Sequence, residues 1–171
     1  LERDLLQGYE RLAQGQDTAG YCSAKLEAWK GKDFSEEFFV LKSLSLPPEE
    51  ALVELGRALE IRPAYAEAYF WRGLMNLRLK NVDGALGDLT RAIEINPRFA
   101  EAFGNRAFLR DFFKQDPAGA VDDYTKAIEI RPRYAEMYSS RGAALSRKGD
   151  PEGALADYAR AMEIAPGFPI P

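Results

Sequence analysis

The sequence predicts an all-α fold built from antiparallel helix pairs, and two observations lead to this prediction. A similar phrase occurs three times, as ALEIRPAYAEAY at 58–69, AIEINPRFAEAF at 92–103 and AIEIRPRYAEMY at 127–138. The prolines within and after these phrases are spaced by 34, 35 and 34 residues, at Pro63, Pro97, Pro132 and Pro166. A fixed period of about 20–50 residues is typical of repeat architectures, so the period decides the fold class.

Small residues recur at matching places of the last three units. Position 8 carries Gly73, Ala107 and Gly142; position 20 carries Ala85, Ala120 and Ala154; position 27 carries Ala92, Ala127 and Ala161. Small side chains on two neighbouring helices let the backbones approach closely. Each unit is therefore expected to form a tight pair of helices.

The second helix of each unit has the clearer pattern. In the first matching unit its apolar residues fall at i, i+1, i+4, i+7 and i+8, namely Ala85, Leu86, Leu89, Ala92 and Ile93. This spacing places them on one face of an α-helix. Good N-cap residues precede the helices, at Asn81, Asp116 and Asp150, and Pro117 and Pro151 follow two of them. Proline is well tolerated at the first helical position, so these residues mark the helix starts.

These positions resemble the tetratricopeptide repeat, a unit of 34 residues with small residues at 8, 20 and 27 and proline at 32. The resemblance implies a right-handed α-solenoid whose first helices line a concave face. The expected organisation is an N-terminal helical cap or eroded repeat at 1–31, a degenerate repeat at 32–65, repeats at 66–99, 100–134 and 135–166, and a tail at 167–171.

Composition excludes several classes of function. The 171 residues carry a net charge of −4 and contain no histidine, and Cys22 is the only cysteine. Histidine-based acid–base catalysis, an intrachain disulfide and a thiolate metal site are therefore excluded, and Cys22 reads as a buried apolar residue. We expect no enzyme activity, cofactor or metal, and no nucleic-acid partner, because the charge is acidic and no basic stripe is present.

The sequence leaves the cellular compartment open. No apolar run approaches the ~20 residues that a membrane-spanning helix needs, so a soluble protein is expected. The chain begins at Leu1 rather than at methionine. Both a cytoplasmic protein and an exported one, from which a signal peptide was removed, fit this start.

A charge pair repeats with the same period. Arginine occupies position 7 and aspartate position 23 in the three matching units, which gives Arg72 with Asp88, Arg106 with Asp123, and Arg141 with Asp157. The degenerate unit has Phe38 and Glu54 at these places. A pair that recurs with the period of the fold is expected to stabilise the fold rather than to bind a ligand, with each arginine reaching the facing helix.

Positions that differ between units are free to determine a partner. In the tetratricopeptide family such positions on the first helices contact a bound peptide, which implies a groove containing Phe70, Trp71, Leu74, Arg78, Asn105, Phe108, Phe112 and Arg147. Exposed aromatic side chains in a concave wall would anchor a peptide or helix. The alternative is that Phe70 and Trp71 pack on the degenerate unit and the N-terminal helices.

The family's carboxylate clamp, which captures acidic chaperone tails, is not predicted here. Only Asn105 matches its residue set, and position 2 carries Glu67, Glu101 and Glu136, which would repel an acidic tail. These glutamates favour a partner with basic plus apolar character, although acids at helix N-termini are also explained by the helix dipole.

The unit at 100–134 has one extra residue. Its downstream segment Lys114–Pro117 aligns with Lys148–Pro151, whereas the distance back to the position-7 arginine is one residue longer. The insertion is therefore expected inside the first helix, within Phe108–Phe113. Either a π-bulge absorbs it, or the helix runs one residue longer and re-aims Phe112 and Phe113.

The leading hypothesis is a non-catalytic scaffold that binds a peptide or helical segment of a protein partner in its concave groove. The alternative is an assembly component that self-associates through its C-terminal face or its N-terminal helices. No capping helix follows the last unit, so its end would expose Leu155, Tyr158 or Met162. A trimmed chain, cover by the tail Phe168–Ile170, or cover by another molecule would each account for this end.

Overall fold

The computed structural model describes residues 36–167, and within this range it contains eight α-helices and no strand. The predicted all-α class is confirmed. The helices fall into two compact units, with the boundary between Ile95 and Asn96. Cys22, the predicted N-terminal segment 1–31 and the tail residues after Gly167 lie outside the described residues.

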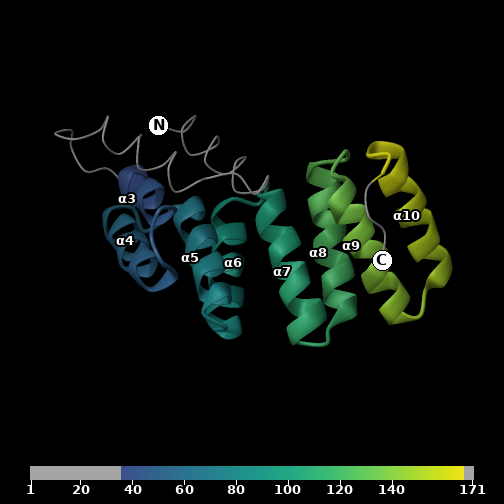
Figure 1. The fold of residues 1–171 in the computed structure, drawn as a ribbon, viewed down its shortest axis with the longest axis horizontal. Helices are drawn as coiled ribbons and strands as arrows, with labels where there is room; N and C mark the ends of the chain where they lie inside the picture. The colour runs from purple at the N-terminus through teal and green to yellow at the C-terminus, as the bar shows by residue number, and fades with distance from the viewer. Residues whose placement is uncertain (1–35, 168–171) are drawn as a thin grey trace. The chain divides into compact units, whose positions relative to one another are not determined.

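The first unit contains α3 (Glu36–Ser43), α4 (Pro48–Ile61), α5 (Ala66–Arg78) and α6 (Val82–Ile95). Figure 1 shows them as successive antiparallel pairs joined by short connections, with α4 packed on α5 between the two pairs. The pairs fall in the predicted ranges 32–65 and 66–99. Ala51, Ala58, Ala85 and Ala92, at the small positions of the second helices, are fully buried.

The degenerate pair α3–α4 has the bulky Phe39 at position 8, and other residues form its core. Val40, Leu41 and Leu55 are fully buried between the helices. Phe39 is only half-buried, and its ring meets that of Phe38 edge to face at 5.5 Å between centroids. Helix α3 therefore buries Val40 and Leu41, the two residues after position 8, and leaves Phe39 half-buried.

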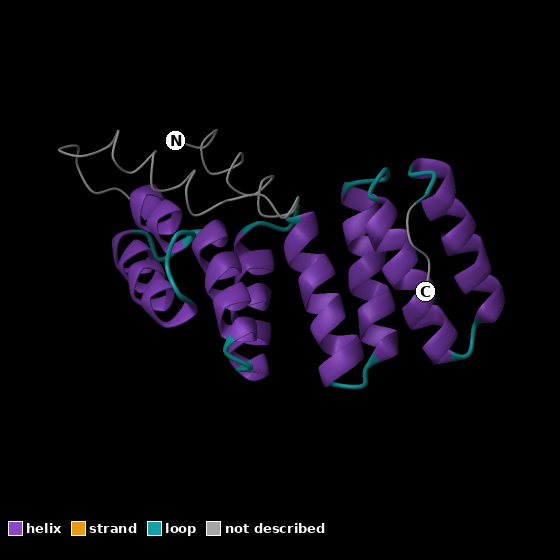
Figure 2. Cartoon of the chain, viewed as in Figure 1, coloured by secondary structure: helices purple, strands orange, loops and turns teal. Residues whose placement is uncertain are grey.

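The second unit contains α7 (Ala100–Phe113), α8 (Pro117–Ile130), α9 (Ala135–Lys148) and α10 (Pro151–Ile164). Consecutive helices pack on one another, and α7 also contacts α9. Figure 2 shows that the connections are short, so each helix returns alongside its predecessor. Ala107, Ala120, Ala127 and Ala161 are fully buried between the helices, as the pattern of small residues predicted.

The predicted N-caps of the second helices are confirmed. The side chains of Asn81, Asp116 and Asp150 each accept a hydrogen bond from the backbone N–H three residues later, at 3.1, 2.8 and 2.9 Å. These bonds satisfy one of the four N–H groups that a helix start leaves without an intrahelical partner. The first helices begin after aromatic residues instead; Tyr65, Phe99 and Tyr134 make no side-chain cap.

Replacing Asp150 by alanine is expected to lower the free energy of unfolding by about 1 kcal/mol, because the cap of α10 is lost. Asp150→Asn keeps an acceptor oxygen and should stay within a few tenths of the native value. Urea unfolding followed by circular dichroism measures both changes. Equal losses in the two variants would show that the side-chain oxygen does not cap the helix.

The extra residue lies in the connection after α7, and its expected place within Phe108–Phe113 is wrong. Helices α7 and α9 both have 14 residues, but Lys114 and Gln115 separate α7 from its next N-cap, whereas Gly149 alone follows α9. The backbone N–H of Lys114 bonds to the carbonyls of Leu109 and Arg110 at 3.2 Å, and that of Asp116 reaches Arg110 at 2.9 Å. The last carbonyl groups of a helix have no intrahelical partner. A wider last turn therefore breaks fewer backbone hydrogen bonds than a bulge inside the helix.

Candidate binding surface

The expected Arg–Asp pair of the first unit joins its two matching helices. Arg72 on α5 donates from Nε and Nη2 to the two carboxylate oxygens of Asp88 on α6, at 3.0 and 2.6 Å. Asn76 donates a further bond of 2.9 Å to the same carboxylate. The bond to Asp88 raises the pKa of the Arg72 guanidinium above its usual value. Asp88 is buried and fully engaged within the fold.

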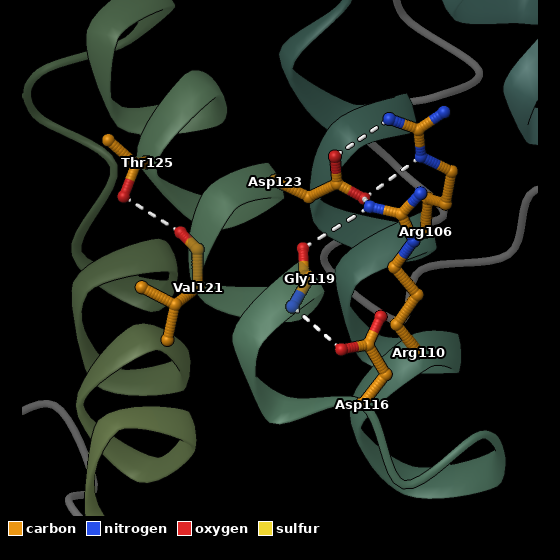
Figure 3. A network of polar contacts seen from close by, with 7 residues as sticks. All are labelled: Arg106, Arg110, Asp116, Gly119, Val121, Asp123 and Thr125. Atoms are coloured by element: carbon orange, nitrogen blue, oxygen red, sulfur yellow. Dashed lines mark hydrogen bonds and ion pairs between the residues drawn. The ribbon is translucent and has the colours of Figure 1, made fainter. Parts of the chain in front are cut away.

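In the second unit Asp123 on α8 accepts from two arginines of α7 (Figure 3). Arg106 donates from Nε and Nη2 at 2.9 and 2.7 Å, and Arg110 Nη1 lies 2.9 Å from the Oδ2 atom. Arg110 also donates to the carbonyl oxygen of Gly119 at 3.3 Å. Asp123 is 3% exposed, so this buried carboxylate links α8 to α7 and is not open to a ligand.

The third pair connects three helices. Arg141 on α9 donates from Nε and Nη2 to Asp157 on α10, both at 2.7 Å. Its remaining terminal nitrogen, Nη1, donates to the hydroxyl of Thr125 on α8 at 3.0 Å. All three nitrogen atoms of the Arg141 guanidinium therefore donate a hydrogen bond. The predicted structural role of the pairs agrees with these contacts, because each carboxylate is buried and already bound.

The degenerate unit replaces the pair with a different arrangement. Glu54 occupies the aspartate position, is buried, and accepts from Lys42 and Arg57 through Oε1, both at 3.0 Å. Its Oε2 atom is buried without a hydrogen bond. The Glu54 carboxylate is thus bonded through only one of its two oxygen atoms.

Two of the four groove residues predicted on α5 are buried. Phe70 is 1% exposed and Trp71 is 4% exposed, and the two rings meet edge to face at 5.3 Å between centroids. The expectation that these two aromatic residues line an open groove is therefore corrected, because buried rings belong to the core. Leu74 is half-buried, whereas Arg78 is exposed and its Nη1 lies 3.9 Å from the sulfur of Met75.

Among residues 36–167, the exposed aromatic residues lie on α7. Phe108, Phe112 and Phe113, here called the aromatic triad, are 38%, 59% and 51% exposed. The ring of Phe108 lies 4.8 Å from that of Phe112 and 6.1 Å from that of Phe113, measured between centroids. Phe108 thus contacts both other rings at the surface, and the three rings form an apolar patch of a kind that is often a binding site.

Arg147 borders the triad and is held by a buried carboxylate. Its Nε donates to Asp111 at 2.9 Å and its Nη2 bonds to the other carboxylate oxygen. The Asp111 side chain is 1% exposed, whereas that of Arg147 is 43% exposed. The guanidinium carbon lies 4.8 Å from the centroid of the Phe112 ring, within the range of a cation–π contact. The bond to Asp111 also raises the pKa of Arg147.

Sequence reasoning placed Phe108, Phe112 and Arg147 in the groove but missed the pair between Asp111 and Arg147. The pair joins α7 to α9 across 36 residues and occurs in one place, so no repetition reveals it. In the sequence, the pair is visible only as an aspartate at position 12 of one unit and an arginine at position 13 of the next unit. Phe113 was also not assigned to the site.

The remaining predicted groove residue of this unit, Asn105, is half-buried and donates to the carbonyl oxygen of Glu101 at 2.9 Å. The Glu101 carboxylate itself bonds to Arg131, which follows α8. Glu136, at the same repeat position on α9, is exposed. Of these two acids, Glu136 is therefore the more open to a basic partner residue.

Within residues 36–167 no group of three or more His, Cys, Asp or Glu side chains is arranged to hold a metal ion. Over the same part of the chain, no helix is both long and apolar enough to cross a membrane. Burial raises the pKa of Tyr124 to about 12.

Comparisons with known proteins agree with the repeat pattern. One family model of the tetratricopeptide repeat matches residues 66–99, and a second matches residues 106–169. No curated protein matches the chain. A crystal structure of MamA is similar, with a TM-score of 0.72 and 25% identity over 92% of this chain and 93% of that one.

A structure of MamA from residue 41 to its end, from Desulfovibrio magneticus RS-1, has a TM-score of 0.69 and 19% identity over 95% of this chain and 93% of that one. A further MamA crystal structure has a TM-score of 0.69 and 23% identity over 92% and 87% of the two chains. At these identities the likeness concerns the fold.

Proposed function

The chain belongs to the tetratricopeptide repeat family, whose members bind protein partners, and we propose that it is a non-catalytic scaffold that binds a peptide or helical segment. One observation carries the proposal: the aromatic triad of α7 is exposed beside Arg147 of α9. Aromatic residues and arginine are the side chains most enriched among those that dominate binding energy at protein interfaces.

The site we propose lies within the second unit. Phe108 and Phe112 would provide the apolar contact, and Arg147 of α9 lies beside the Phe112 ring. Asn105, which precedes Phe108 by about one turn of α7, is the fourth residue of the proposed site. Leu74 and Arg78 belong to the first unit, where they are half-buried and exposed, and they are not part of this site. Phe70 and Trp71 are assigned to the core and are not part of the proposed site.

A random peptide library displayed on phage and panned against the purified chain tests the proposal. Peptides enriched on the native chain should bind Phe108→Ser/Phe112→Ser at least roughly thirtyfold more weakly, the effect of losing a dominant contact of about 2 kcal/mol. Leu155→Ser is the matched control, because Leu155 is also an exposed apolar residue, 68% exposed on α10. Peptides that bind all three proteins equally would overturn the proposal, and so would a library without enrichment.

Self-association is a second candidate function, favoured by the apolar face of α10. Leu155 and Met162 are 68% and 49% exposed there. If this face joins two copies, the native chain should have twice the monomer mass by light scattering at micromolar concentration, and Leu155→Ser/Met162→Ser should have the monomer mass. A native chain that is monomeric under the same conditions would contradict this candidate.

A further inference from the structure

We propose that the aromatic triad and Arg147 bind an acidic segment of a partner protein. A large apolar side chain of the segment packs on Phe108 and Phe112, and a neighbouring Asp or Glu accepts hydrogen bonds from Arg147. This inference rests on the proposed function and adds the chemistry of the partner. It replaces the basic partner that the position-2 glutamates favoured, because Glu101 is bonded to Arg131 and the charged side chain in contact with the triad is Arg147.

The hydrogen-bonding geometry of Arg147 is the first reason. Its Nε and Nη2 atoms bond to Asp111, and its Nη1 atom makes no hydrogen bond to any described residue. A guanidinium has five N–H donors in a planar fork and no acceptor, so only an acceptor such as a carboxylate can complete it. With 43% of its side chain exposed, Arg147 presents these donors to solvent beside the Phe112 ring.

The comparison with Arg141 shows that this open donor edge is not a requirement of the fold. Arg141 lies on the same helix and also forms a bidentate pair, but its Nη1 atom is bound by Thr125 at 3.0 Å. Arg147 has the same type of pair without a third partner. Because Asp111 is buried, the pair fixes the guanidinium before binding, and a fixed donor loses less entropy when a ligand arrives.

The position of the Arg147 charge is the second reason. Arg147 is the charged side chain in contact with the triad, through the Phe112 ring. Lys114 and Lys148 follow the triad and Arg147 in the chain, and each is followed two residues later by an exposed N-cap aspartate of opposite charge, Asp116 and Asp150. The preference for an acidic segment therefore rests on the Arg147 guanidinium, which attracts a carboxylate beside the aromatic surface.

The helix dipole explains part of this arrangement but not all of it. Lysines are stabilising at helix C-termini, which accounts for Lys114 and Lys148. It does not account for three exposed phenylalanines, nor for a buried aspartate that holds an arginine over one of them. An apolar anchor with an acidic neighbour uses all of these features together.

Fluorescence anisotropy with three defined peptide pools tests the inference on the full chain. Each pool has Phe, Leu or Trp at the centre, and the flanking residues are Asp and Glu in the first pool, Ser in the second, and Lys and Arg in the third. We expect the acidic pool to bind about tenfold more tightly than the serine pool, the effect of one charge-assisted hydrogen bond. The preference should shrink as salt is raised, because exposed charges are screened.

Two variants separate the contributions of charge and aromatic surface. Removing Arg147 alone would leave Asp111 charged and buried, so Asp111→Leu/Arg147→Met replaces both partners and preserves packing. It should lose the preference for the acidic pool and keep the binding of the serine pool. Phe108→Ser/Phe112→Ser should lose the binding of every pool, while Leu155→Ser should bind as the native chain does.

The outcomes distinguish this inference from the proposed function. If the serine or basic pool binds the native chain as well as the acidic pool does, and binding still needs Phe108 and Phe112, the inference is overturned and the proposed function stands. Unchanged acidic preference in Asp111→Leu/Arg147→Met also overturns the inference. If no pool binds, or binding survives the loss of both phenylalanines, the proposed site itself is wrong.

Discussion

Asp123→Ala is expected to lower the free energy of unfolding by about 3 kcal/mol, because it removes the acceptor of two arginines at once. Arg106 is 13% exposed and loses a bidentate partner, and Arg110, at 32%, loses an ion pair. A buried guanidinium without its carboxylate retains the cost of desolvation and no longer has the attraction that offset it. Urea unfolding of the full chain measures the loss.

Two controls make this result specific. Glu129→Ala removes one partner of an exposed pair with Lys126, where 57% of the Glu129 side chain is accessible, and should change stability by about 0–1 kcal/mol. Arg106→Met/Asp123→Leu should cost less than Asp123→Ala alone, since replacing both partners leaves no unpaired buried charge at this pair. Equal effects of Asp123→Ala and Glu129→Ala would show that the buried pair does not stabilise the helix pair.

Gly142→Val is expected to destabilise the second unit by about 1–3 kcal/mol through overpacking. A Cβ atom at this position would lie 2.7 Å from Cε1 of Tyr158 and 3.1 Å from the carbonyl oxygen of Ala154. Helices α9 and α10 would have to separate to admit it. Urea unfolding, with the helical signal as readout, measures this change.

Gly87→Val is the matched control for Gly142→Val. Gly87 is also inside a helix, but a Cβ there would meet nothing within 4 Å. Glycine and valine differ in helix propensity by only a few tenths of a kcal/mol, so this variant should stay within about 0.5 kcal/mol of the native chain. A loss at Gly87 as large as that at Gly142 would assign the effect to propensity rather than to close helix packing.

The features that repeat along the chain were predictable from the sequence. Small residues at the helix contacts, N-caps at Asp116 and Asp150, and the pair between Arg141 and Asp157 all recur at one period. A position that agrees in several units has the same neighbours in each of them, because every unit has the same local geometry. Recurrence therefore predicts contacts within a unit.

The features that occur once were not predictable in the same way. The sequence placed the extra residue inside α7, whereas hydrogen bonds at Lys114 and Asp116 place it after the helix. An alignment counts residues but does not show which backbone groups can change partner. Only the three-dimensional course of the last turn determines where an additional residue is accommodated.

The sequence by itself determined that this chain forms helix pairs, because hydrophobic period, caps and small contact positions are local properties of each unit. The tertiary structure decided which aromatic residues are available. Phe70 and Trp71 are buried, whereas Phe108 and Phe112 remain exposed beside an arginine from a different helix. Burial depends on which elements cover a face, and the pair between Asp111 and Arg147 depends on side chains 36 residues apart meeting in space. Neither property has a local signature in the chain.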